Sequence, residues 1–125
     1  MRMWMTNPKI MCNKHLLGEH VELHMFVGSI KKKIGLDGYV KNKLLELKSI
    51  HSRHKELSIE MINRGMKHSS PLDVDVDISF YPNTVIESVV PREWSKNELL
   101  NRCIECKRRY DAEQGIDEYV DKTIE

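Results

Sequence analysis

Apolar residues recur at spacings of three and four positions from residue 13 onward, which is the clearest pattern in the chain. This is the period of one face of an α-helix, so it predicts a first helix with one buried side. Asn13 is a suitable residue to cap its N-terminus. We expect the buried stripe to contain Leu16, His20, Leu23, Val27, Ile30 and Ile34. His20 is thereby assigned to the edge of the core.

A second helix is predicted over residues 39–64. The glycines at 35 and 38 interrupt the first pattern, and helical spacing then returns, with a kink expected near Ser49. Gly65 is well placed to end this helix, because glycine readily takes the left-handed backbone conformation that helix ends use. Residues 67–91 differ. Their prolines and the alternation of Val74, Val76, Ile78 and Phe80 favour an ordered loop or a short strand across the helices.

A third helix is predicted over residues 96–110. Ser95 and Glu98 have the spacing of a capping box at its start, and Gly115 is a candidate for its end. The acidic tail, residues 116–125, is expected to dock through Ile116, Tyr119 and Val120. The fold class predicted is therefore mainly α: a compact single-domain helical bundle of about three long helices, with an irregular or short extended segment near 67–91.

Composition limits the number of domains and the classes of partner that we expect. With 125 residues, 40% of them hydrophobic, the chain is expected to form one domain, 1–125, with a modest core. Twenty basic and nineteen acidic residues give a net charge of +1, which does not by itself indicate a nucleic-acid partner. The chain has three basic clusters: Lys31–Lys33; Lys41, Lys43 and Lys48; and Lys107–Arg109. Each is either a solvated face or a patch that contacts phosphates. The longest apolar runs are too short to cross a membrane.

Three cysteines, an odd number in a chain without a signal-peptide pattern, predict a reducing cytoplasm and no disulfide framework. Cys103 and Cys106 form a CxxC motif, but it lies within the predicted third helix, where we expect the buried side to contain Leu99, Leu100, Cys103 and Ile104. A zinc site would need two more ligands, either His51 and His54 or Cys12 and His15, and none of the strong zinc spacings is present. No metal or other cofactor is therefore expected.

The N-terminus offers a candidate nucleophile. Arg2 is too bulky for the usual removal of the initiator, so Met1 is expected to keep its own α-amino group. Such groups titrate near pH 8, about two units below lysine, so an appreciable fraction is neutral at physiological pH. The alternative is that this amine is chemically idle, as most N-termini are.

A pair of carboxylates lies on the first helix. His15, Glu19 and Glu22 are spaced i, i+4 and i+7, so they share one face. If that face is partly desolvated, one carboxylate should stay protonated to higher pH than the other, which is how an acid–base pair is poised. The alternative is an ordinary solvated acidic face.

These residues resemble a known family. Met1-Arg2-Met3-Trp4, the pair Pro8-Lys9, and the run from His15 to Glu19 that leads to Glu22 are similar to the opening of the pyrimidine-dimer DNA glycosylases, the dimer-specific endonuclease V family of phages, viruses and bacteria. The run from Glu56 to Gly65 resembles the second long helix of that family and its Arg-Gly end. The resemblance covers roughly residues 1 to 68.

The resemblance implies a bifunctional enzyme. Its N-terminal amine attacks C1′ of the damaged nucleotide, displaces the base and forms an imine, and β-elimination then cuts the strand. Met1 matches the nucleophile position without a gap, and Arg2 and Glu22 match their counterparts. Glu22 is then expected to stabilise the sugar cation and to manage protons. The departure from the phage pattern is that Met1 must stay untrimmed.

DNA contacts follow from the same comparison. Arg2 is expected to clamp a phosphate, His15 to contact the backbone nearby, and Lys14 replaces a glutamine of the family. Val21 and Met25 stand where the phage helix is basic, so the contacts must be rearranged. The full set assigned to DNA is Arg2, Lys14, His15, Lys31, Lys32 and Lys33.

The expected partner is double-stranded damaged DNA, bound by a monomer in the cytoplasm of a bacterial cell or phage-infected host. Trp4, Trp94 and Tyr81 are candidates to stack on an unstacked base. Three alternatives stay open: a non-catalytic DNA-binding helical protein, a glycosylase and lyase for a different damaged or modified base, and a metal-bound module that would explain Cys103 and Cys106.

Overall fold

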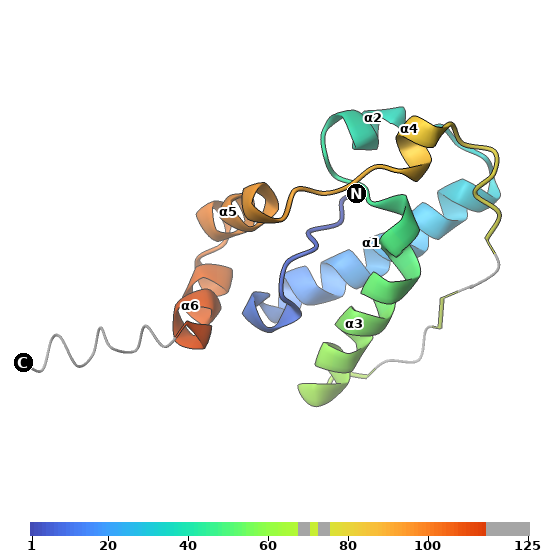
Figure 1. Cartoon of the computed structure of the whole chain (residues 1–125). Helices are drawn as coiled ribbons and strands as arrows, with labels where there is room; N and C mark the ends of the chain where they lie inside the picture. Colours follow the sequence, from blue (N-terminus) through green and yellow to red (C-terminus); the bar gives the residue numbers. More distant parts are fainter. Residues whose placement is uncertain (68–70, 73–75, 115–125) are drawn as a thin grey trace, which may run out of the picture.

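The computed structural model describes residues 1–67, 71–72 and 76–114. Within these ranges the chain forms helices joined by loops and contains no β-strand, so the mainly helical fold is confirmed (Figure 1). The α-helices are α1 (Asn13–Lys31), α2 (Asp37–Lys41), α3 (Ile50–Asn63), α4 (Asn83–Ile86), α5 (Arg92–Arg102) and α6 (Ile104–Glu113). Two short 3₁₀ turns accompany them, η1 (Pro8–Ile10) and η2 (Leu47–Ser49).

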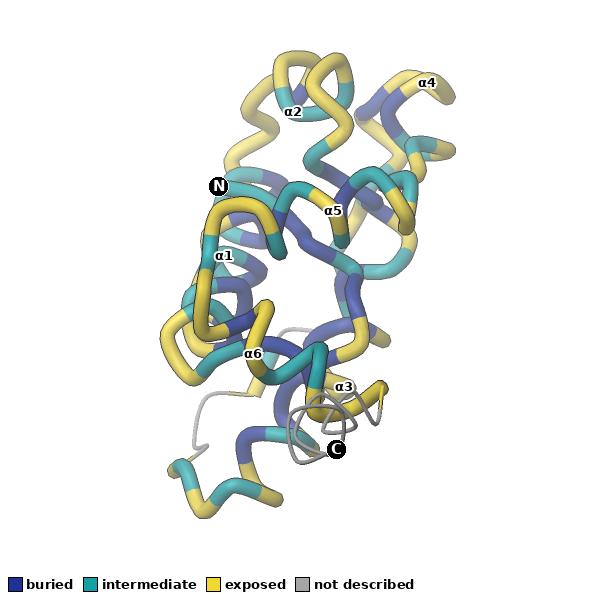
Figure 2. Tube along the Cα trace, turned by 90° about the vertical axis from the view of Figure 1, so that its left-hand side faces the viewer, coloured by how far each residue is buried: buried dark blue, intermediate teal, exposed yellow. Residues whose placement is uncertain are grey.

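Helices α1 and α3 pack against each other and form the centre of the molecule. Figure 2 shows buried positions along both helices and in the segment that follows the N-terminus. The predicted stripe of α1 is buried as far as Ile30, and His20 is buried with it. Ile34 is a wrong prediction: α1 ends at Lys31, and Ile34 is half exposed beyond it. The N-cap is Cys12 rather than Asn13, because the Cys12 thiol accepts the backbone N–H of His15.

The predicted second helix is divided. The chain forms the short α2, turns at Lys43 with a φ of 63°, and becomes helical again only at α3. The intervening residues pair with the N-terminal segment instead, since Met3 N–H donates to the Leu44 carbonyl at 2.7 Å. The expected kink near Ser49 is where α3 begins. Gly65 follows the end of α3 with a φ of +78°, as predicted.

The predicted third helix differs most. Helix α5 begins at Arg92, so the proposed capping box is wrong: Ser95 lies inside α5 and its hydroxyl donates to the Trp4 carbonyl. The helical run over 96–110 is interrupted at Cys103, whose backbone is extended (φ −128°, ψ 110°). Among the described residues of 67–91 there is a short helix, α4, in place of a strand. Val74, Gly115 and the tail from residue 116 lie outside the described residues.

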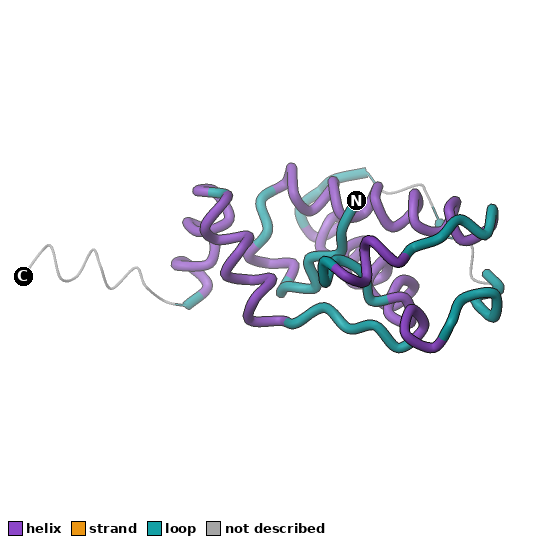
Figure 3. The backbone as a smooth tube through the Cα atoms, turned by 90° about the horizontal axis from the view of Figure 1, so that it is seen from above, coloured by secondary structure: helices purple, strands orange, loops and turns teal. Residues whose placement is uncertain are grey.

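Two ends of the molecule are apparent. Figures 1 and 3 show α5 and α6 together at one end, and α2 and α4 toward the other, with the N-terminus between them. Helix α6 packs on η1, directly before the start of α1. The N-terminal segment, with Met3 and Trp4 buried, is thereby enclosed by parts of the chain that are distant in sequence.

Candidate functional site

The Met1 amine and the Glu22 carboxylate face the same cleft. The amine nitrogen lies 3.9 Å from Glu22 Oε1, and both groups are mostly buried. The cleft has a volume of about 420 Å³; we call it the amine cleft. It is lined by Met1, Arg2, Glu22, Asn42, Leu44, Trp94, Glu98 and Arg102.

The position of the amine is set by the segment that carries it. Met3 N–H donates to the Leu44 carbonyl, and the Trp4 carbonyl accepts the Ser95 hydroxyl. The first residues are therefore held between the α2–η2 connection and α5. Because Met3 is fully buried and Trp4 nearly so, this segment cannot shift without exposing apolar surface.

The position of Glu22 depends on the anchoring of α1. One turn earlier, the Glu19 carboxylate accepts two hydrogen bonds from Arg53 of α3, at 2.7 and 2.9 Å, and both side chains are fully buried. Arg53 also donates to the Thr6 carbonyl at 2.6 Å. Arg53 therefore joins α1, α3 and the N-terminal segment, and Glu19 is an ion-pair partner rather than the second member of an acid–base pair.

Burial raises the pKa of Glu22 above its ordinary value, and the Met1 amine and the Arg2 backbone N–H offset part of this. Repulsion from Glu19 is a smaller contribution in the same direction as burial. The pKa of Glu22 is thus raised mainly by desolvation rather than by repulsion from the neighbouring carboxylate. A carboxylate in this state can exchange a proton with a neighbouring amine.

Arg2 lies beside the amine. Its guanidinium donates to Glu98 Oε1 at 3.0 Å and stacks on the Trp4 ring at 3.5 Å from the ring centre. Two further nitrogens, Nε and Nη2, are buried and find no hydrogen-bond partner among the described residues. Burial lowers the Arg2 pKa, and Glu98 counteracts it. Donors that are buried without a hydrogen-bond partner are costly.

The other predicted DNA residues lie outside the cleft. Lys14 is exposed on the first turn of α1. Lys31, Lys32 and Lys33 are exposed at the far end of α1, about 14 Å along the helix from Glu22. His15 is half-buried, with its Nδ1 at 3.2 Å from the Cys12 sulfur.

Trp94 lines the amine cleft, while the other two aromatic candidates are buried elsewhere. Tyr81 donates its hydroxyl to the Ile34 carbonyl at 2.6 Å, and Trp4 is covered by Arg2. Asn42, Leu44, Glu98 and Arg102 were not predicted as site residues. Nothing in the local pattern marks them, because they reach the cleft only through the packing of α2 and α5 beside the N-terminus.

The fold also assembles two groups of metal-capable side chains. Cys12, His15, Cys103 and Cys106 have ligand atoms that all lie within 4.8 Å of one another. His20, His24 and His54 form a second group, with ring centres 4.6 to 5.1 Å apart. The CxxC motif therefore meets Cys12 and His15 rather than His51 and His54.

Residues 1–74 match the family model of the pyrimidine dimer DNA glycosylases, and the chain belongs to this family. This family consists of DNA repair glycosylases, whose substrate is DNA. The matched part includes α1, α3, Met1 and Glu22, whereas Trp94, Cys103 and Cys106 lie beyond it. Comparison with curated proteins and with solved structures gave no match. None of the helices in the described ranges has the length and apolar character needed to span a membrane.

Proposed function

We propose that this protein is a glycosylase with associated lyase activity that acts on pyrimidine dimers in double-stranded DNA, with the Met1 amine as nucleophile and Glu22 as its proton acceptor. The single observation that carries the proposal is the 3.9 Å separation between this amine and the Glu22 carboxylate in one cleft.

The chemistry needs few groups. The neutral amine forms a bond to C1′ while the bond from C1′ to the base breaks, and the base leaves with that electron pair and takes up a proton. Glu22 stabilises the positive charge on the sugar and accepts a proton from the attacking nitrogen. Opening of the sugar ring gives an imine. Removal of a proton from C2′ then expels the 3′ phosphate, which cuts the strand.

The surroundings of the amine support this assignment. Arg2 lines the cleft beside the amine, and its guanidinium suits a phosphate oxygen next to the lesion. Trp94, half-buried at the cleft, offers an aromatic face to an unstacked base. Arg2 belongs to the N-terminal segment that carries the amine, and Trp94 belongs to α5, which is hydrogen-bonded to that segment through Ser95 and Trp4.

The test is borohydride trapping on duplex DNA that carries either a thymine dimer or an abasic site, with the attached residue mapped by mass spectrometry. We expect an adduct at the Met1 amine on both DNAs. Glu22→Gln should lower the single-turnover rate on dimer DNA by about 10²-fold or more. Glu87→Gln is the matched control, because it removes one negative charge from an exposed residue outside the cleft.

A lysine near the cleft provides a second control. Lys43 Nζ lies 5.7 Å from the Trp94 ring centre, so it is an alternative amine. Lys43→Arg should trap as the unaltered protein does. An adduct on Lys43, or no adduct on either DNA, contradicts the proposal, and the second result favours a non-catalytic DNA-binding protein. Trapping on abasic DNA alone would retain the lyase and exclude the dimer as substrate.

A further inference from the structure

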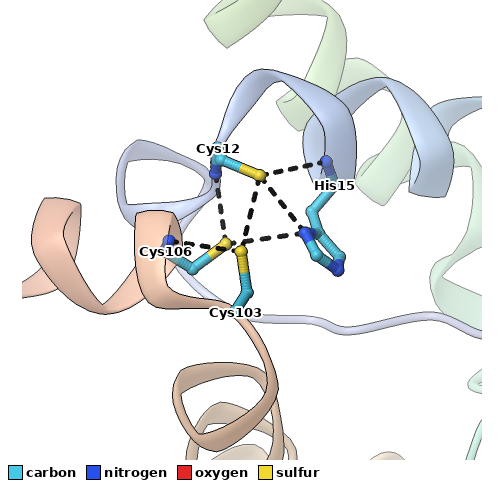
Figure 4. A group of neighbouring side chains, drawn as sticks. All are labelled: Cys12, His15, Cys103 and Cys106. Carbon is cyan, nitrogen blue, oxygen red and sulfur yellow. Dashed lines mark hydrogen bonds between the residues drawn. The ribbon is translucent and has the colours of Figure 1, made fainter.

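Three thiols and one imidazole converge where the start of α1 meets the start of α6 (Figure 4). Cys12 Sγ lies 3.2 Å from His15 Nδ1 and 3.8 Å from Cys103 Sγ, and Cys106 Sγ lies 3.8 Å from His15 Nδ1. Figure 4 shows the three sulfur atoms and this ring nitrogen pointing toward a common centre. All three cysteines are free thiols.

The two halves of this cluster have the same local construction. Cys12 and His15 form a CxxH motif at the N-terminus of α1, and Cys103 and Cys106 form a CxxC motif at the N-terminus of α6. In each half the first cysteine is the N-cap, and its sulfur accepts the backbone N–H three residues later. Cysteine is not among the preferred N-cap residues, so its use at both helix starts calls for a separate reason.

The break between α5 and α6 also has no local cause in the sequence. No proline or glycine lies between Arg92 and Glu113, and the sequence pattern alone continues the helix through Cys103. The extended backbone of Cys103 instead turns its sulfur toward Cys12. The Cys12 N–H also donates to the Cys106 sulfur at 3.2 Å. Backbone donors thus surround the sulfur atoms, as they do around metal-bound thiolates.

We propose that Cys12, His15, Cys103 and Cys106 bind one zinc ion, with three thiolates and the neutral Nδ1 of His15 as ligands. A tetrahedral zinc ion with bonds of about 2.3 Å to sulfur and about 2.0 Å to nitrogen separates its ligand atoms by roughly 3.5 to 3.8 Å. Three separations between ligand atoms of this cluster, 3.2 Å, 3.8 Å and 3.8 Å, lie close to this range. Binding displaces the thiol protons, so up to three protons are released to solvent.

The ligand types and the short distances between them favour a zinc ion over an iron–sulfur cluster or a disulfide. Three sulfurs and one imidazole are a common ligand set of structural zinc sites. An iron–sulfur cluster attaches its ligands to separate iron atoms and spreads them more widely than one ion does, whereas these atoms all lie within 4.8 Å. A disulfide would join two of the thiols at about 2.05 Å and leave the third thiol and His15 unused.

The site has a structural consequence that is independent of the proposed glycosylase. It would link the segment that begins α1 to the α5–α6 pair, which lies beyond the part matched by the family. His15 precedes Glu22 by seven residues on the same helix, about 10 Å along its axis. Zinc would therefore hold α5, which contributes Trp94 and Glu98 to the amine cleft, against the helix that carries Glu22.

The test is elemental analysis of the full chain purified under reducing conditions, followed by chelation and addition of zinc sulfate. We expect one zinc per chain, protection of all three thiols from a thiol reagent until zinc is removed, and a rise of more than about 5 °C in the unfolding midpoint when zinc is restored. Cobalt(II) in place of zinc should give the absorption of a tetrahedral ion with thiolate ligands.

Matched variants locate the ion. Cys103→Ser and Cys106→Ser should lose stoichiometric zinc, and because such variants can fail to fold, circular dichroism accompanies each measurement. His24→Gln, in the second metal-capable group, should keep one zinc per chain. A folded, reduced protein that binds less than a tenth of an equivalent of zinc, or one whose zinc is lost with His24→Gln but kept in Cys106→Ser, overturns the proposal.

Discussion

Arg53 is the residue on which the centre of the molecule depends. Its side chain is fully buried, and it binds Glu19, Glu56 and the Thr6 carbonyl. Removing one partner of a buried ion pair leaves the other charge uncompensated, which is more costly than replacing both.

We therefore expect Arg53→Met to lower the free energy of unfolding by about 3 to 5 kcal/mol. Lys55→Met, at an exposed position of the same helix, should change it by less than about 0.5 kcal/mol. The double substitution Glu19→Leu with Arg53→Met should be less destabilised than Arg53→Met alone. Urea unfolding followed by circular dichroism measures all three, and an Arg53→Met loss as small as that of Lys55→Met would refute this role.

The proposed role of Glu22 predicts that the activity depends on pH. Burial raises its pKa, and only the carboxylate can accept a proton from the amine. The mechanism also needs a neutral amine, and α-amino groups ordinarily titrate near pH 8, so protonation of the amine lowers the activity first as the pH drops. Protonation of Glu22 should add a second fall at lower pH, and this steeper part of the single-turnover profile on dimer DNA should lie above the ordinary glutamate value of about 4.3. Glu22→Gln should keep the first fall and lack the second. A second fall that persists in Glu22→Gln would show that another group causes it.

At the scale of elements, Glu46 ties the segment before α3 to the start of α5. Its carboxylate accepts the Val90 N–H and both terminal nitrogens of Arg92. Burial by itself would raise the pKa of Glu46, but the hydrogen bonds from Arg92, Ser49 and Val90 together with the Arg92 charge outweigh burial and lower the pKa to about 2. The folded state therefore favours the ionised carboxylate.

This lowered pKa predicts a specific acid sensitivity. An unfolded glutamate titrates near pH 4.3, so the stabilisation is complete above that pH and is lost as the pH falls from there toward about 2. The ionised Glu46 carboxylate thus contributes about 2 to 3 kcal/mol to the free energy of unfolding. Glu46→Gln should be less stable at neutral pH and should lose less stability across this interval. Urea titrations at several pH values measure the difference, and parallel curves for the two proteins would contradict it.

At the scale of the whole molecule, the net charge of +1 means that DNA binding must rely on local clusters. Lys31, Lys32 and Lys33 are exposed together at the end of α1. At the other end of the molecule, Lys107 pairs with Asp111 and Arg108 with Glu105. We therefore take Lys31, Lys32 and Lys33 as the cluster to test for contact with a phosphate backbone.

Replacing all three lysines of the first cluster by glutamine should reduce the salt dependence of DNA affinity, with a change in the slope of log K against log salt of up to about 2.7. Lys107→Gln with Arg108→Gln should change it much less, because those charges are already paired. Fluorescence anisotropy with duplex DNA at several salt concentrations measures both. An unchanged slope for the lysine variant would remove Lys31, Lys32 and Lys33 from the interface.

The sequence by itself determined the local features whose cause is also local. The 3.6-residue period of α1 buried its stripe through Ile30, because adjacent turns of one helix share a face. Gly65 ended α3 because only its backbone readily adopts a positive φ. The resemblance of the N-terminal residues to a glycosylase family likewise agrees with the family to which the chain belongs.

Tertiary structure alone decided how distant segments meet. Glu19 does not act as the predicted partner of Glu22, because Arg53 from α3 binds the Glu19 carboxylate in the core. The third helix broke at Cys103 although its pattern is continuous, and the break brings the CxxC motif to Cys12 and His15. Trp94 enters the amine cleft because α5 packs beside the N-terminus. Such contacts join residues far apart in the chain, and periodicity carries no information about which distant faces will pack together.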